Sequence, residues 1–311
     1  MKLSSFLGVN SEELEVRGIL DKDVDADIES FLYYESIRDS NIPEFENVSE
    51  KYKLFFSQLW GKLNKIYEES GGSEKVYLHP EYRKVVELVL FREYRGVGLG
   101  YADSYKNCKG WTLEDAKLLI ERLLVQLSVK FVYSNRQLDD YFDSIPLTAN
   151  TIERIGPDKT SDMLAFFIHT ELARYTERHL KELITIVPIE DSKFSMFVIN
   201  GVEYTLPRRA EGYPILFIPK NFVTGGYTQE RRVLGIIYDL LIDTGKDIDD
   251  IFGVSIVADT RLHSADVLRK KQKEVKRGKK VVNLTEKKEH LSKYKGDLLD
   301  KVLPVLFDID E

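Results

Sequence analysis

The chain has 311 residues, of which 43% are hydrophobic and 31% are charged, and its formal net charge is −7. This composition is ordinary for a soluble protein, and the length suffices for one large domain or two modest ones with a real core. The single cysteine, Cys108, excludes an internal disulfide and a zinc cluster held by thiolates. No apolar run is long enough to span a bilayer, and the N-terminal segment does not have the pattern of a signal peptide. We therefore expect a cytoplasmic protein that does not enter a membrane.

The charge is spread unevenly along the chain. Residues 269–295 hold twelve Lys or Arg and three Glu, a local charge of +9, which leaves −16 on the rest. A basic segment beside an acidic body is typical of nucleic-acid or acidic-partner contacts, although many such runs are solvated helices and loops. We expect one α+β globular domain over 1–260, with a sub-boundary near 135–150 as an alternative, and a basic helical C-terminal segment over 261–311. The candidate nucleic-acid contacts in the chain are Arg208, Arg209, Lys270, Lys271, Lys276, Arg277, Lys279 and Lys280.

The first half of the chain reads as mainly helical. A helix start is expected at Asn10, a short strand near 31–33, and a helix over 48–69 that ends at Gly71. A second long helix is expected over 80–94, followed by glycines at alternate positions in 96–100 that let the backbone approach a neighbour or form a flexible connector. Thr112 and Asp115 then form a capping-box-like pair at the start of another helix.

The stretch from Ile155 to Asp162 carries two carboxylates, an amine and two hydroxyls in front of an amphipathic helix. Leu164, Ile168 and Leu172 recur at helical spacing after it. In one interpretation Thr160 or Ser161 caps the helix and the aspartates are turn and first-turn residues. In the other, the same carboxylates form a functional site, because carboxylates with perturbed pKa values gather in such places.

The region after this helix predicts a small sheet. Asn200-Gly201 separates two β-prone runs, which predicts a hairpin over 194–206. The short apolar run 215–218 predicts a buried strand that delivers Lys220 at its end. The fold class expected is therefore α+β, predominantly helical, with a small mainly antiparallel sheet made by the hairpin and the strand over 215–218.

Several of these stretches together resemble an uncharacterised bacterial family that is often met in mobile-element or phage-defence settings. The resemblance covers residues 8 to about 220, and its most specific part is a Gly-x-Asp-x-x-Ser-Asp loop, here Gly156 to Asp162. The other matching pieces are Gly8-Val9 with Glu13-Leu14, Asp25 and Asp27, Pro43-Glu44-Phe45, Glu93 with Gly98-Leu99-Gly100-Tyr101, and Pro219-Lys220. The chain departs from the pattern at Asp103-Ser104-Tyr105-Lys106 and at Leu32-Tyr33-Tyr34. The family implies a site without naming its chemistry.

Two functions follow as hypotheses. In the first, the chain is a Mg²⁺-dependent nuclease in which Asp158, Asp162 and Glu93 bind the metal, and Asp158, Asp162, Glu203 and Lys220 are catalytic. Restriction-type nucleases have an acid two residues before the strand-end lysine, and here Ile218 stands there, so Glu203 on the neighbouring strand is the substitute. In the second, the chain is a non-catalytic adaptor of a defence complex that binds nucleic acid or a protein partner, and these side chains are structural.

Overall fold

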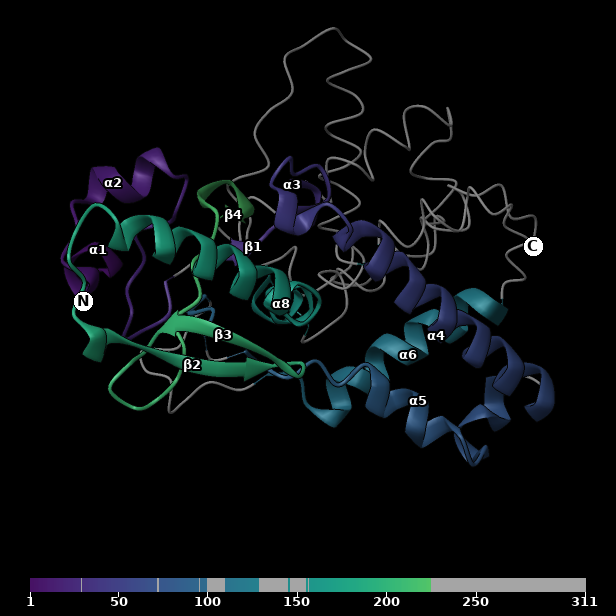
Figure 1. The fold of residues 1–311 in the computed structure, drawn as a ribbon. Helices are drawn as coiled ribbons and strands as arrows, with labels where there is room; N and C mark the ends of the chain where they lie inside the picture. Colours follow the sequence, from purple (N-terminus) through teal and green to yellow (C-terminus); the bar gives the residue numbers. More distant parts are fainter. Residues whose placement is uncertain are drawn as a thin grey trace, which may run out of the picture.

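The computed structural model describes residues 1–28, 30–71, 73–94, 96–99, 110–128, 145, 155 and 157–224. Helices dominate these residues, and the strands form two separate antiparallel pairs, so the α+β, mainly helical class is confirmed (Figure 1). In chain order the elements are α1 (Leu3–Leu7), α2 (Ser11–Val16), β1 (Phe31–Leu32), α3 (Tyr34–Arg38), η1 (Pro43–Phe45), α4 (Val48–Ser70), η2 (Ser73–Leu78), α5 (Tyr82–Leu88), α6 (Leu113–Ser128), α8 (Pro157–Ile184), η3 (Asp191–Lys193), β2 (Phe194–Ile199), β3 (Val202–Pro207), η4 (Lys220–Phe222) and β4 (Val223–Thr224).

Helix α8 is the element against which the others pack. Its 28 residues extend about 42 Å at the usual rise per residue. The hairpin and the β1–β4 pair both contact it, and α4 also packs against it. The six residues 160–165 are all buried, so the first part of α8 is enclosed on every side rather than on one stripe. Any polar side chain in this part must therefore find a partner inside the protein or remain without one.

Aromatic side chains fill the space between α4 and α8. Rings of α4, α8 and the residues after α5 contact one another edge to face or tilted, at centroid distances such as 5.0 Å for Tyr52 and Phe167 and 5.0 Å for Phe91 and Trp111. Lys51 adds a polar tie, since its Nζ donates to the carbonyl of Phe167 at 2.7 Å. Each buried ring contributes a few kcal/mol of burial energy, so this cluster is a main source of stability for the region.

The hairpin agrees with the sequence-based prediction and extends one residue further, to Pro207. Strands β2 and β3 pair from Phe194 with Pro207 to Ile199 with Val202. Asn200 and Gly201 adopt φ values of 50° and 78°, which a two-residue hairpin turn requires. The hairpin lies along α8, because the backbone N–H of Thr205 donates to Glu177.

The strand predicted over 215–218 is not assigned as a strand. The segment is buried, but its N–H groups donate to separate places: Leu216 to the carbonyl of Gly96 at 2.9 Å and Phe217 to the Thr176 hydroxyl at 2.8 Å. Isolated bridges join Pro214 to Arg208 and Pro219 to Ile19. The apolar run is therefore a buried extended connector, and the second sheet is the β1–β4 pair instead, in which Phe31 faces Thr224.

Helix boundaries were predicted unevenly. The helix ending at Gly71 is confirmed, with that glycine at φ 71° as the C-cap, and Thr112 and Asp115 do form a reciprocal cap. The helix predicted over 80–94 is shorter, since α5 ends at Leu88. There, hydrogen bonds from Val89 to Val86 and from Leu90 to Glu87 tighten the last turn. Among the described helices, none combines the length and apolar composition needed to cross a membrane.

Two glycines with opposite surroundings test the packing after α5. A methyl group added at Gly110 would overlap the backbone nitrogen of Glu93, whereas one added at Gly61, inside α4, would meet nothing within 4 Å. We expect Gly110→Ala to lower the free energy of unfolding by about 1–3 kcal/mol through overpacking. Gly61→Ala should raise it by about 0.5–1 kcal/mol through helix propensity. Urea denaturation of both variants measures this, and a neutral Gly110→Ala would contradict the close approach of the two segments.

Candidate functional site

Helix α8 begins earlier than the sequence predicts, and this changes the role of the polar stretch. Pro157 is its first residue, a favoured position for proline. Thr160 and Ser161 therefore lie within the helix, both buried, and do not cap it. Asp158 and Asp162 stand four residues apart and so share one face of the first turns. The aspartates, placed by the sequence in a loop, are brought together by helical spacing.

The residues between the two aspartates have structural partners. Lys159 Nζ lies 2.5 Å from the Asp115 carboxylate, which is fully buried at the start of α6. The indole of Trp111 donates to the Lys159 carbonyl at 2.6 Å. The Ser161 hydroxyl accepts from the Leu32 N–H at 3.0 Å and so holds strand β1 against the helix. These contacts fix the helix start firmly in the fold.

The carboxylates of Asp158 and Asp162 are not used in this way. Asp162 is 7% exposed and Asp158 is partly buried. Ser161 and Lys159 have a hydrogen bond and an ion pair. Within the described part of the chain, the carboxylates of Asp158 and Asp162 have neither. A buried carboxylate without such partners is costly, so an aspartate retained there calls for another explanation than packing.

Two further acids act on this pair. Burial, and after it the negative charges of Asp158, Glu93 and Asp27, together raise the pKa of Asp162 to about 9. Burial, and then the charge of Asp27, raises the pKa of Asp158 to about 6. Lys159 opposes both shifts. The structure thus gathers four carboxyl groups, from residues 27, 93, 158 and 162, into one electrostatically coupled set, which we call the acid cluster.

A buried lysine adjoins the acid cluster, and no local pattern in the chain indicates its role. Lys22 is 1% exposed, and its ammonium donates to the carbonyls of Gly96 and Val97. Burial, and after it the charge of Arg209, lowers the pKa of Lys22 to about 7, and Asp27 opposes the shift. Lys22 therefore ties the segment after Glu93 to the segment that carries Asp27. The sequence around Lys22 shows aspartates at alternate positions, 23, 25 and 27, a pattern typical of a solvated acidic turn and not of a buried lysine.

Lys220 does not join the acid cluster. Its ammonium lies 2.6 Å from Glu15 of α2, and its backbone N–H donates to Gly18. The same end of α2 contacts α8 at Tyr175, whose hydroxyl donates to the Arg17 carbonyl. Tyr175 is thirteen residues after Asp162, about 20 Å along the helix. The catalytic lysine expected from the sequence is thus placed beside the middle of α8, because the apolar run 215–218 passes the helix there.

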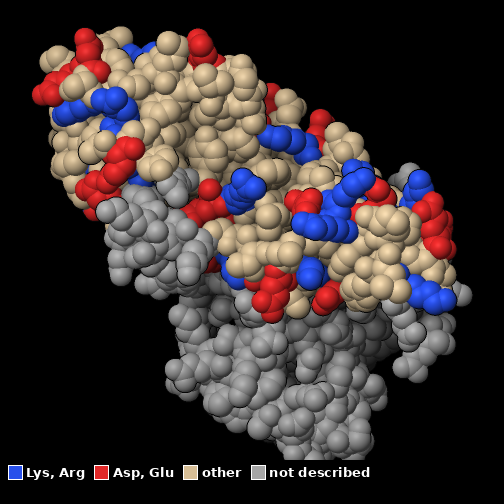
Figure 2. All heavy atoms as spheres, turned by 90° about the horizontal axis from the view of Figure 1, so that it is seen from below, with Lys and Arg blue, Asp and Glu red and all other residues tan. Residues whose placement is uncertain are grey.

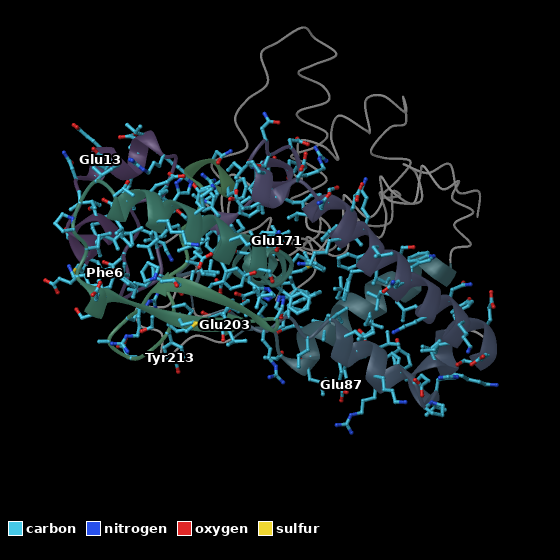
Figure 3. The ribbon with its side chains drawn as sticks, viewed as in Figure 1. Phe6, Glu13, Glu87, Glu171, Glu203 and Tyr213 are labelled. Carbon is cyan, nitrogen blue, oxygen red and sulfur yellow. The ribbon has the colours of Figure 1, made fainter. Side chains whose placement is uncertain are left out.

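Glu203 is also separate from the aspartates. It lies on β3 opposite Val198, exposed on the outer side of the hairpin (Figure 3). Its neighbours Tyr204 and Leu206 are buried. Because Tyr204 and Leu206 alternate with it along the strand, Glu203 faces away from the core where the helix lies.

The predicted phosphate contacts differ from one another. Arg208 is exposed, but Arg209 is 3% exposed and lies within electrostatic range of Lys22, so it is not a surface contact. Lys270, Lys271, Lys276, Arg277, Lys279 and Lys280 lie outside the described residues. On the face drawn in Figure 2, basic and acidic side chains are interspersed rather than gathered by sign.

The prediction that Asp158, Asp162 and Glu93 bind a metal remains a prediction. Asp158, Asp162 and Glu93 are electrostatically coupled, as a shared site requires. However, in the ranges that the structure describes, no three His, Cys, Asp or Glu side chains already form a group that could hold a metal ion. A cation would have to draw these carboxylates together to reach the ~2.0–2.6 Å distances of Mg²⁺ and Ca²⁺ ligands.

Comparison with known proteins gives a family without an activity. No match was found among curated proteins or among solved structures. A family described as a domain of unknown function, DUF8370, matches residues 8–228, a span that contains every member of the acid cluster. That match covers more than two thirds of the chain and nearly coincides with the span of the resemblance to an uncharacterised family. The chain belongs to the DUF8370 family.

Proposed function

We propose that the protein is a Mg²⁺-dependent nuclease whose metal site is the acid cluster, and that it acts in a bacterial defence or mobile-element setting. One observation carries the proposal: Asp162 is nine-tenths buried, has no hydrogen bond or ion pair to the described residues, and lies within electrostatic range of Asp158, Glu93 and Asp27. At neutral pH such a group holds either a proton or a cation. The setting rests on the motifs shared with the uncharacterised family.

The chemistry follows from the residues of the acid cluster. Asp158 and Asp162, on one face of α8, supply hard oxygen ligands, and Glu93 and Asp27 add charge from two other segments. A divalent cation held by these carboxylates would lower the pKa of a bound water and neutralise charge on a scissile phosphate. Lys159 takes the place proposed for Lys220, because it is the lysine that acts electrostatically on both aspartates. Because Lys159 is held by its ion pair with Asp115, we assign it the role of a positioning residue and not of a catalytic one.

A second function, a non-catalytic adaptor that binds nucleic acid or a protein partner, is favoured by a different observation. Lys220 and Glu203 are remote from the aspartates. The lysine and the substitute acid that a restriction-type site would need are therefore not part of the acid cluster. In this function the exposed Arg208, with the basic segment 269–295, carries the phosphate contacts.

Magnesium should stabilise the folded protein through Asp162. We expect Mg²⁺ to raise the melting temperature, since a ligand at 100 times its Kd stabilises by about 2.7 kcal/mol. Asp162→Asn should abolish the rise, and Asp191→Asn, at an exposed aspartate of η3, should keep it. An equal rise in both variants, or none in the unchanged protein, refutes the metal site.

Cleavage of nucleic acid is measured separately on the same three proteins. The proposal predicts Mg²⁺-dependent cleavage of DNA or RNA that is lost in Asp162→Asn and retained in Asp191→Asn. A Mg²⁺-dependent rise in melting temperature without cleavage would leave a metal-binding adaptor. Binding that weakens steeply with salt but does not depend on Asp162 would favour the second function.

The stability of the protein should depend on pH through Asp162. Its pKa is 3.8 in its ordinary state and about 9 when folded, so the folded state holds a proton that the unfolded state releases across this window. Stability contributed in this way falls as pH rises from about 4 to 9. The Asp162→Asn variant lacks this titration and so should not lose stability in the same way. The melting temperature of the variant, minus that of the unchanged protein, should therefore increase from pH 5 to pH 8. Each 1 kcal/mol corresponds to about 2–4 °C.

Lys22 titrates with the opposite effect on stability. Both the Asp162→Asn variant and the unchanged protein contain Lys22, so its own titration does not produce a difference between their melting temperatures. Its folded pKa of about 7 lies below the ordinary 10.5, which makes stability rise with pH between these values. Asp191→Asn serves again as control and should give a constant difference. A difference for Asp162→Asn that is constant from pH 5 to pH 8 would contradict the raised pKa.

Adjacent arginines should separate surface contact from structure. Arg208→Ala should weaken binding to nucleic acid about two- to fivefold at low salt, with no change in melting temperature, since it is exposed. Arg209→Ala should instead lower the melting temperature, because it leaves a hole in a buried site. Fluorescence anisotropy with a labelled oligonucleotide and thermal melting measure the two effects. The reverse assignment would show that Arg209 reaches the surface.

A further inference from the structure

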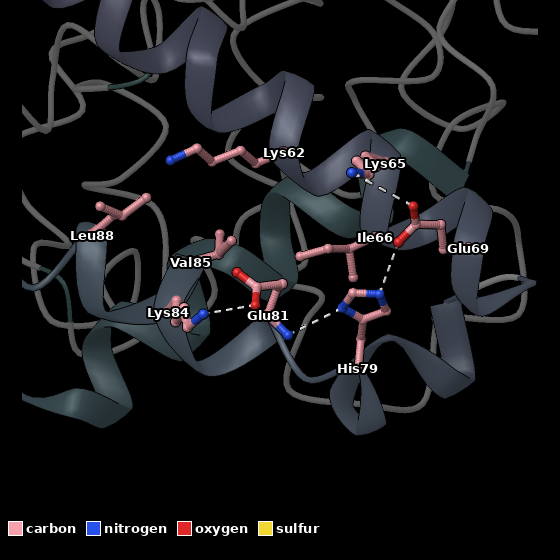
Figure 4. A pocket seen from close by; sticks show the side chains of 9 residues that line it. All are labelled: Lys62, Lys65, Ile66, Glu69, His79, Glu81, Lys84, Val85 and Leu88. Atoms are coloured by element: carbon pink, nitrogen blue, oxygen red, sulfur yellow. Dashed lines mark hydrogen bonds and ion pairs between the residues drawn. The ribbon is translucent and has the colours of Figure 1, made fainter.

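A pocket of about 380 Å³ lies between α4 and α5, and none of its lining residues belongs to the acid cluster (Figure 4). Lys62, Lys65, Ile66 and Glu69 line it from α4. From the other side it is lined by His79, Glu81, Lys84, Val85 and Leu88. Both helices contribute residues at steps of three and four, so one face of each helix looks into the same space. The volume is within the range of small-molecule sites.

The floor of the pocket is apolar. Ile66 and Val85 are buried at its base, and Leu88 at the end of α5 is 40% exposed. An aliphatic floor of this kind stabilises a ligand by about 25 cal/mol for each Å² of apolar surface that it covers. The pocket therefore favours a ligand with an apolar body.

The acids at the rim are already occupied. Glu69 lies 3.7 Å from Lys65 and 3.0 Å from His79 Nε2, and Glu81 lies 2.8 Å from Lys84. The Glu81 N–H donates to His79 Nδ1 at 3.2 Å, so the ring carries a proton on Nε2, which donates to Glu69. Both carboxylates are thus held by neighbouring basic or imidazole groups.

Lys62 is the remaining charge. It is exposed and extends from α4 over the opening, and in the described part of the chain no carboxylate pairs with it (Figure 4). The lining residues include three lysines and two acids, so an anion on the ligand would balance the charge. An anionic group on Lys62 and an apolar body over Ile66, Val85 and Leu88 would use every unoccupied feature of the pocket.

From this geometry we propose that the pocket between α4 and α5 binds a small organic anion with an apolar body. The ammonium of Lys62 pairs with the anionic group, and the aliphatic floor covers the body. The site is separate from the proposed nuclease centre and does not depend on metal. Its occupant is recognised by charge and shape and not by a chemical step.

Two fluorescent probes that differ in charge test the proposal on the full chain. The probes are 8-anilinonaphthalene-1-sulfonate, which is an anion, and N-phenyl-1-naphthylamine, its neutral counterpart. Lys62→Ala should raise the Kd of the sulfonate about two- to fivefold, the effect of an exposed ion pair. The same variant should leave the Kd of the neutral probe unchanged. Leu88→Ser should weaken both probes.

Matched controls lie outside the pocket on exposed helix surface. Lys181→Ala on α8 and Leu54→Ser on α4 remove the same groups at exposed positions, and neither should change the Kd of either probe. Each of the five proteins is measured at the same number of degrees below its own melting temperature. Differences in probe binding to unfolded chain are then excluded. Sulfonate binding that Lys62→Ala and Lys181→Ala affect equally, or that Leu88→Ser does not affect, overturns the proposal.

Discussion

The enclosure of the first turns of α8 is the constraint on which the rest of this structure depends. Residues 160–165 are buried on all sides of the helix, so each polar group there needs an internal partner. Ser161 meets strand β1, and Lys159 meets Asp115 of α6. These two contacts join elements that are far apart in the sequence to one helical turn. Asp162 occupies the same enclosed turn without a hydrogen-bond or ion-pair partner among the described residues, and the proposed metal site rests on this difference.

The buried charges around this turn are coupled to one another. Asp27 acts on Asp158 and Asp162 from one side and on Lys22 from the other. Lys22 in turn holds the carbonyls of Gly96 and Val97, close after Glu93. A change of protonation at any one group therefore alters the field at the others, and the group titrates as a set. The fold places Lys159 and Lys22 within electrostatic range of these acids without pairing the two aspartates among the described residues.

The sequence could predict what depends on local spacing and not what depends on where distant segments cross. The hairpin follows from Asn200-Gly201, and the proximity of Asp158 to Asp162 follows from helical spacing once the helix starts at Pro157. The partner of Lys220 could not be predicted, because it is set by where the connector 215–218 passes α8. The burial of Lys22 had no local signal, since lysine is almost never fully buried without a partner.

The opposite exposure of Arg208 and Arg209 is a feature that the sequence alone could have predicted. Adjacent residues on an extended segment point to opposite sides, so a pair of arginines there cannot both face solvent when one side is covered. Arg209 faces the core beside Lys22, and Arg208 faces outward. Of the two arginines predicted to contact nucleic acid, only Arg208 is therefore on the surface.

A buried carboxylate without a partner lowers the stability of the fold, and the surrounding core has to offset that cost. An unsatisfied buried polar group costs about 1–3 kcal/mol and a charged one more. The aromatic contacts between α4, α8 and the residues after α5 lie immediately beside the aspartates and provide burial energy of the same order. Departures of this kind from local rules concentrate at functional sites, where neighbouring packing compensates for them. The unpaired Asp162 near a dense aromatic core is therefore the physical observation on which the proposed metal site rests.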